Sequence, residues 1–235
     1  MASKKIVFII VEGPSDDEAL GVIFHRLYSS NEVHVEITHG DMTSDDAVGP
    51  ENIEEKINEL IERYAGHTFQ PDDFKEVIHL VDMDGAFVPD DCVVFDSGAA
   101  KTYYKRTEIC TDDCRKIRVR NAHKKANMTR LYACGAVWGS VSYRCYYMSC
   151  NLDHVLHDKQ NCADREKQDK AFQFAERYKD DLDGFLSFIC DSSFSRIGDF
   201  VESWEYIKQG THSLERNTNL GICLAGVREA RWRGA

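Results

Sequence analysis

The chain has 235 residues, and 40 Asp and Glu outnumber 29 Lys and Arg, which gives a net charge of −11. This charge argues against a protein that holds nucleic acid by bulk electrostatic attraction. No apolar run has membrane-spanning length. Glu12 interrupts the first apolar stretch too early for a signal peptide, so we expect a cytoplasmic protein without a membrane partner.

The N-terminal segment predicts a buried strand followed by a helix. Residues 5–11 form an apolar run that stops at Glu12 and Gly13. Ser15 is the expected N-cap of the next helix, because acidic residues follow it where the helix dipole favours negative charge. Apolar residues between positions 20 and 27 then recur at helical spacing.

Two further strands and one more helix follow in the first 85 residues. Residues 33–38 alternate between apolar and polar side chains, and a strand is expected at 76–81, where a mainly apolar run from Val77 to Val81 leads into Asp82 and Asp84. Between them, residues 53–64 have apolar positions at helical spacing. The order strand–helix–strand–helix–strand predicts a parallel sheet with right-handed crossovers.

The rest of the chain divides into an insertion and a C-terminal part. Residues 86–142 show no clear long helix, and we expect an irregular basic insertion there. Residues 143–148 predict a further strand, and helices are expected at 164–179, 182–190 and 197–208. We therefore expect a core at 1–85 with an acidic metal site, an insertion at 86–142, and a segment at 143–235 that completes the same domain.

The acidic residues at the strand ends predict a divalent-metal site. The carboxyl edge of an open α/β sheet is where ligands bind, and neighbouring strands lie about 5 Å apart. Clustered carboxylates at Glu12, Asp82 and Asp84 would repel one another, and a hard cation such as Mg²⁺ would relieve that repulsion. The alternative is that these acids only cap helices or begin turns. This alternative is strongest for Asp16 and Asp41.

The segment Val11-Glu12-Gly13-Pro14-Ser15-Asp16, followed later by Asp82-Met83-Asp84, resembles the TOPRIM domain of topoisomerases, bacterial primases and OLD-family nucleases. The resemblance covers residues 5–85. It implies a TOPRIM-like open parallel α/β sheet flanked by helices. It also implies that Glu12 is the general acid/base and that Asp82 and Asp84, joined by Asp16, bind Mg²⁺, for which Mn²⁺ can substitute.

The only basic region of this acidic chain lies within residues 101–130, which hold ten Lys and Arg against three acids. We expect this segment to steer a nucleic-acid backbone towards the acids, with tyrosines available to stack on bases. A solvated loop is the alternative. The residues expected to bind DNA or RNA are Lys101, Lys105, Arg106, Arg118, Arg120, Lys124, Lys125 and Arg130.

The nine cysteines leave two interpretations open. Cys110 and Cys114, with His123 and later cysteines, are the nearest approach to a zinc set, but the CxxC spacing of a zinc knuckle is missing. Because the count is odd and no secretion signal is present, we favour reduced thiols without a metal.

Two functions follow from these observations. The first is an Mg²⁺-dependent nuclease that cleaves DNA or RNA; the resemblance to phage-defence nucleases suggests an effector of bacterial antiviral defence. The second is a non-catalytic TOPRIM-like subunit that docks an ATPase or another defence-system chain. The sequence has no P-loop, so any ATPase would be a separate chain.

Overall fold

The computed structural model describes residues 5–28, 33–39 and 41–234. Its main sheet contains four parallel strands in the order β2–β1–β3–β8, namely β1 (Lys5–Val11), β2 (Val33–His39), β3 (Phe74–Asp82) and β8 (Val141–Ser149). The short strands β7 (Ala136–Val137) and β9 (Asn217–Thr218) pair with β8 in antiparallel fashion. The expected α/β class is therefore confirmed, but the sheet is mixed rather than entirely parallel.

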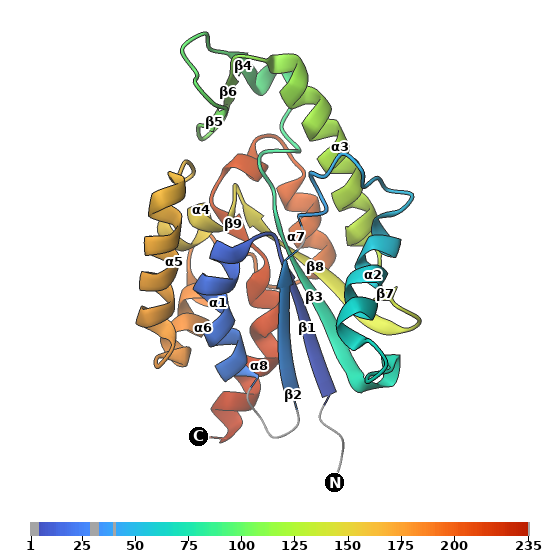
Figure 1. Ribbon diagram of the computed structural model, residues 1–235. Coiled ribbons are helices and arrows are strands. Elements are labelled where there is room, and N and C mark those ends of the chain that lie inside the picture. Colours follow the sequence, from blue (N-terminus) through green and yellow to red (C-terminus); the bar gives the residue numbers. More distant parts are fainter. Residues whose placement is uncertain (1–4, 29–32, 40, 235) are drawn as a thin grey trace.

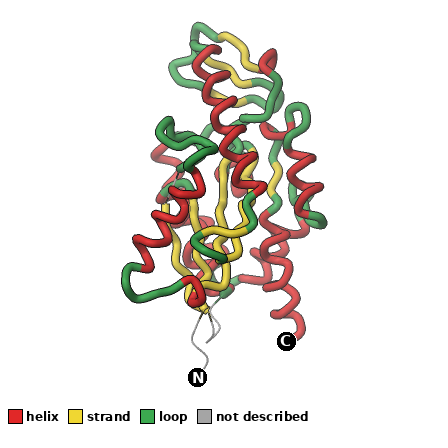
Figure 2. Tube along the Cα trace, turned by 90° about the vertical axis from the view of Figure 1, so that its right-hand side faces the viewer, coloured by secondary structure: helices red, strands yellow, loops and turns green. Residues whose placement is uncertain are grey.

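Helices cover both faces of this sheet (Figure 1). One face is covered by α1 (Pro14–Leu27), α5 (Asp164–Tyr178), α6 (Leu182–Asp191) and α8 (Leu220–Gly234), and the other by α2 (Ile53–Ala65), α3 (Cys114–Ala133) and α7 (Phe200–Ile207). The short helix α4 (Leu152–His157) follows β8. The side view shows red helices on both sides of the yellow strands (Figure 2).

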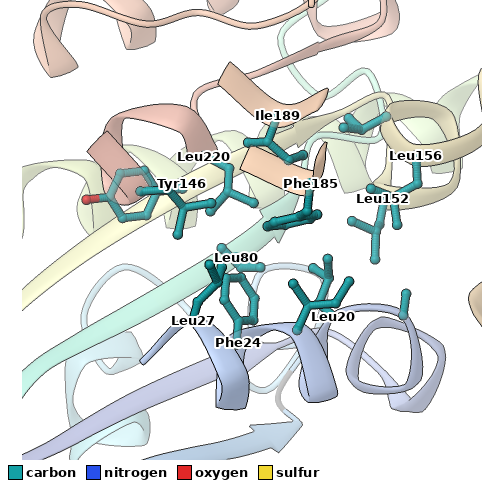
Figure 3. Packing of buried hydrophobic residues seen from close by; sticks show 14 of the residues in the cluster. Leu20, Phe24, Leu27, Leu80, Tyr146, Leu152, Leu156, Phe185, Ile189 and Leu220 are labelled. Atoms are coloured by element: carbon teal, nitrogen blue, oxygen red, sulfur yellow. The ribbon is translucent and has the colours of Figure 1, made fainter. Parts of the chain in front are cut away.

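The alternation of side chains along β1 explains this layered arrangement. Val7 and Ile9 belong to the core under α1, whereas Ile6 and Phe8 belong to the core under α2. Successive strand residues point to opposite faces, so a continuous apolar run is what a strand covered on both sides requires. The first core joins side chains of α1, α6 and α8 over the sheet (Figure 3).

The insertion differs from the expectation, because it contains the longest helix of the described residues. Strands β4 (Val93–Phe95), β5 (Tyr103–Tyr104) and β6 (Ile109–Thr111) form a small separate sheet at the top of the molecule (Figure 1). The 20-residue α3 follows them. Sequence periodicity did not indicate this helix because polar side chains occupy part of its buried face, namely Asn121, Lys124 and Asn127.

Other local expectations were confirmed or corrected. The predicted strands and the helices at 53–64, 164–179 and 182–190 are all present with small shifts of their ends, and the last predicted helix begins three residues later, at Phe200. The expected N-cap Ser15 is wrong: Gly13 is the N-cap, and its N–H donates to the Asp16 carboxylate at 2.9 Å. Helix α8 and three 3₁₀ turns (Pro71–Asp73, Asp90–Cys92 and His212–Leu214) were not predicted. Within the described ranges, no helix is both long and apolar enough to cross a membrane.

Candidate functional site

Glu12 and Asp82 lie together at the carboxyl edge of the main sheet. Glu12 follows β1 and Asp82 is the last residue of β3, and these two strands are parallel neighbours in the sheet. The Glu12 carboxylate accepts the backbone N–H of Asp82 at 2.9 Å and the hydroxyl of Thr43 at 3.3 Å. Because these partners come from β3 and from the segment after β2, they fix the position of Glu12 between neighbouring elements.

Asp84 reaches the same place through a tight turn. Its φ of 46° and the φ of 66° at Gly85 are both left-handed, a conformation that Asp tolerates better than most residues and that suits Gly. A Cβ at position 85 would lie 2.5 Å from the side chain of Leu214. The Asp84 N–H donates to the carbonyl of Cys150 at 2.7 Å, which ties the turn to the end of β8.

The Lys124 ammonium links two of the three acids. Its side chain, from α3, has no exposed surface, and its Nζ lies 2.5 Å from Asp84 Oδ2 and 3.6 Å from Glu12 Oε1. Removing such a charge from water is costly unless opposite charges surround it. Lys124 is thus the buried cation of the acidic cluster.

Arg120, one helical turn before Lys124, adds a second positive charge. Its Nη2 donates to the backbone carbonyl of Asp84 at 2.8 Å, and its Nη1 donates to the Tyr104 hydroxyl at 2.9 Å. That hydroxyl in turn donates to Asp84 Oδ1 at 3.2 Å. Asp84 therefore lies in a network of donors from α3 and β5.

The pKa values of the three carboxyl groups are shifted in different directions. Burial raises the pKa of Glu12 to about 8, with Lys124 opposing the change and Asp84 adding to it. Burial and the nearby Glu12 also raise the pKa of Asp82 well above its usual range. Burial acts in the same direction on Asp84, but Lys124 and Arg120 outweigh it and lower the Asp84 pKa. Near neutral pH Glu12 is therefore expected to be largely protonated, whereas Asp84 is a carboxylate.

Asp16 lies beside this cluster and has a structural contact of its own. It accepts the Gly13 N–H at the start of α1. Burial raises its pKa, and the neighbouring Asp153 adds to the rise. Asp153 pairs with Lys167 of α5 at 3.6 Å. Sequence reasoning did not assign Asp153 or Lys167 to the site, because both lie far along the chain from the acidic strand ends.

The acids open into a pocket of about 330 Å³, which we call the acidic pocket. Its lining combines the acids with basic and amide side chains, including Glu12, Asp82, Asp84, Lys101, Asn161 and Lys167. Lys101, from the insertion, and Lys167, from α5, therefore place positive charge at a pocket that also contains the carboxyl groups. This combination suits a ligand that carries a phosphate group.

The arrangement does not fit a bound Mg²⁺, although carboxylate oxygens are the right donor chemistry. Asp82 Oδ1 accepts the backbone N–H of Leu152 at 2.9 Å, and Asp84 Oδ2 is held by Lys124. In the described parts of the chain, no group of three or more His, Cys, Asp or Glu side chains is placed to hold a metal ion. The same finding covers the cysteines considered for zinc, all nine of which are free thiols.

The basic residues expected to bind nucleic acid are divided among several places. Lys124 and Arg120 belong to the acidic cluster, and Lys124 has no exposed surface with which to contact a phosphate. Three others pair with partners of the chain: Arg130 with Glu54, Lys105 with Glu108, and Arg118 with backbone carbonyls. Of the remaining three, Lys101 and Arg106 line pockets, and Lys125 is exposed with its ammonium over the ring of Phe87.

Comparisons of the chain with protein-family models, with curated proteins and with solved structures give no match.

Proposed function

We propose that this chain hydrolyses phosphodiester bonds of DNA or RNA at the acidic pocket. The observation that carries the proposal is the position of Glu12: its largely buried carboxyl group, with a pKa of about 8, lies 3.6 Å from the buried Lys124 ammonium and lines the pocket. A proton-transfer group is most effective when its pKa lies near the working pH. The resemblance of residues 5–85 to the TOPRIM domain supports the same role for Glu12.

The charges of the pocket are compatible with an anionic substrate. Glu12, with a pKa of about 8, is largely protonated near neutral pH, the pKa of Asp82 is raised by burial, and the negative charge of Asp84 faces both Lys124 and Arg120. A phosphate group that enters therefore meets the cations Lys101 and Lys167 as well as the carboxyl groups. Fixed positive charges near the phosphate also stabilise the charge that develops in the transition state.

In the proposed reaction, water adds to phosphorus and the bond from phosphorus to the leaving oxygen breaks. Glu12, protonated at neutral pH, donates its proton to that oxygen, the attacking water releases a proton to solvent, and solvent then reprotonates Glu12. Lys124 and Arg120 hold Asp84 and supply positive potential from behind the carboxyl groups. Lys101 and Lys167, which line the pocket, are the residues proposed to contact the phosphate.

Mg²⁺, or Mn²⁺ in its place, remains a prediction of the TOPRIM resemblance. Binding of a divalent ion by Glu12 and Asp84 would require the Lys124 ammonium to leave them, since it lies within 3.6 Å of both. No step above depends on the ion.

A cleavage assay with the purified chain tests the proposal. End-labelled single-stranded and double-stranded DNA and RNA are incubated with Mg²⁺ or with EDTA. We expect wild type to cleave at least one substrate and Glu12→Gln to lose about 10²–10⁴-fold in rate. The matched control is Glu18→Gln on the exposed side of α1, which should cleave like wild type. Equal rates for Glu12→Gln and wild type would contradict the proposal.

One observation favours the alternative of a non-catalytic subunit that docks another chain, such as an ATPase. The exposed side chains of Ile197 and Trp232 line an apolar hollow of about 450 Å³ beside α8. Two results together would favour this alternative over the proposed hydrolysis. The purified chain would cleave no nucleic acid, and cleavage that depends on Glu12 would not appear when a partner chain such as an ATPase is added.

A further inference from the structure

A second pocket, of about 510 Å³, opens beside the acidic pocket and carries three arginines. We call it the arginine pocket. Its charged lining consists of Arg106, Arg196 and Arg216 together with the acids Asp158 and Glu215. Gln160 lines both pockets, and its Nε2 donates to the carbonyl of Leu214 at 2.7 Å. The two pockets are therefore neighbours.

Neutral groups orient two of these guanidinium groups. Arg216 donates through Nε and Nη2 to the carbonyl of Val155, at 3.0 and 2.7 Å, and lies over the ring of Phe194. Arg196 donates to Asn217 and to the hydroxyl of Tyr206. Since these partners carry no charge, the positive charges are held in position without being neutralised by them.

The carboxylates of the pocket only partly compensate for the arginines. Asp158 Oδ2 lies 3.8 Å from Arg216 Nη1, and the Asp158 side chain is 69% exposed. Arg106 forms no ion pair with any residue that the structure describes. Arginines fixed around one hollow repel one another, and an anion with several oxygen acceptors relieves that repulsion through charge-assisted hydrogen bonds.

A buried histidine adds a neutral donor to the same pocket. His154 Nδ1 accepts the backbone N–H of Cys150 at 3.0 Å. The imidazole is therefore protonated at Nε2, and Nε2 is a donor. The side chain is 9% exposed and lines the pocket, and the nearest acid to its Nε2 is Asp158 at 3.7 Å. A phosphate oxygen is a suitable acceptor for this donor.

We propose that the arginine pocket binds a phosphate group of the nucleic-acid strand next to the bond that is cleaved. The inference rests on the proposed function of the acidic pocket, because it places the two pockets along one strand. Both pockets lie at the carboxyl edge of the sheet. Two elements that contribute to the arginine pocket lie at the end of β8: α4 follows it in the chain, and β9 pairs with it. The pocket would thus position the substrate rather than take part in the bond cleavage.

Arg106→Gln is the informative variant, because Arg106 is exposed and has no structural partner among the described residues. The control is Arg63→Gln on the exposed side of α2, which removes the same charge elsewhere. Binding of fluorescein-labelled single-stranded DNA and RNA is measured by anisotropy in EDTA over a range of salt concentrations. Binding is thereby separated from cleavage.

We expect Arg106→Gln to weaken binding about fivefold to tenfold and to lower the slope of log K against log salt by about 0.7, the value for one contact to a single strand. Arg63→Gln should bind like wild type, and inorganic phosphate should compete with the oligonucleotide on wild type. Equal binding by the two variants would overturn the proposal, as would binding of inorganic phosphate without binding of either oligonucleotide. If Glu12→Gln loses cleavage but Arg106→Gln binds like wild type, the proposed role of the arginine pocket is contradicted, while the proposed function of the acidic pocket is supported.

Discussion

The role of Lys124 is the main difference between the expected and the observed site. The sequence placed this lysine on a nucleic-acid surface, whereas the structure places its ammonium between Glu12 and Asp84 with no exposed surface. Although burial disfavours its charged form, Asp84 and Glu12 raise the pKa of Lys124 above its usual range. Lys124 therefore stays charged and partly balances the acids that were expected to attract a metal.

Replacing Lys124 should destabilise the fold and should also allow a divalent cation to bind where the ammonium lay. We expect Lys124→Met to lower the free energy of unfolding by about 3–5 kcal/mol, because Asp84 loses its buried partner. Addition of Mn²⁺ should recover part of that loss, while wild type gains little. Urea unfolding with and without Mn²⁺ measures both effects.

The neighbouring lysine provides the control for this experiment. Lys125 is exposed, so Lys125→Met should change stability by no more than about 0.5 kcal/mol. If Lys124→Met is as stable as Lys125→Met, the buried ion pair contributes nothing to the fold. If it is destabilised but gains nothing from Mn²⁺, the acids have no affinity for a divalent ion even when the ammonium is gone.

At the scale of elements, α3 connects the insertion to the acidic site. Its buried face carries Asn121, Lys124 and Asn127 among apolar residues. Lys124 contacts the acids, whereas Asn127 donates from Nδ2 to the carbonyls of Thr43 and Val48, at 3.2 and 2.8 Å. The helix thereby holds the segment after β2, from which Thr43 donates to Glu12.

Asn127→Leu tests this connection. The change leaves two carbonyl groups without their donor, and we expect a loss of about 1–3 kcal/mol in stability. Hydrogen exchange should also become faster in residues 43–48. Thr129→Ala, at an exposed position of the same helix, serves as the control and should change neither quantity. Unchanged exchange in residues 43–48 for Asn127→Leu would show that α3 does not hold this segment.

The sequence predicted those elements whose apolar pattern reflects burial in a simple way. Residues 6–11 and 77–81, apart from His79, are apolar because strands covered on both faces need apolar side chains on both faces. The same patterns placed Glu12 and Asp82 at one edge. Helix α3 was not predicted because polar side chains occupy part of its buried face. Asn121, Lys124 and Asn127 stand where apolar residues would otherwise show helical periodicity. The pairing of Lys124 with the acids depends on long-range packing, which spacing along the chain does not encode.

At the scale of the whole molecule, the charge distribution favours contact with nucleic acid at one edge only. The net charge is −11, and the pockets at the carboxyl edge of the sheet nevertheless gather basic side chains, namely Lys101 and Lys167 in the acidic pocket and Arg106, Arg196 and Arg216 in the arginine pocket. A strand is therefore expected to bind locally and with strong dependence on salt, while the rest of the acidic surface repels it. Under the proposed function, this charge distribution would restrict productive binding to the edge where Glu12 lies.

The pH dependence of single-turnover cleavage by wild type and by Glu12→Gln tests most directly whether Glu12 donates a proton. The Glu12 pKa of about 8 means that its protonated form predominates below that pH and declines above it. We predict a wild-type rate that is level below about pH 8 and then falls about tenfold per pH unit, because each unit removes nine-tenths of the remaining protonated form. Glu12→Gln, which cannot titrate at this position, should be about 10²–10⁴-fold slower at pH 7 and lack the fall. A wild-type profile with no inflection, or the same inflection in Glu12→Gln, would contradict the assignment of Glu12 as the proton donor.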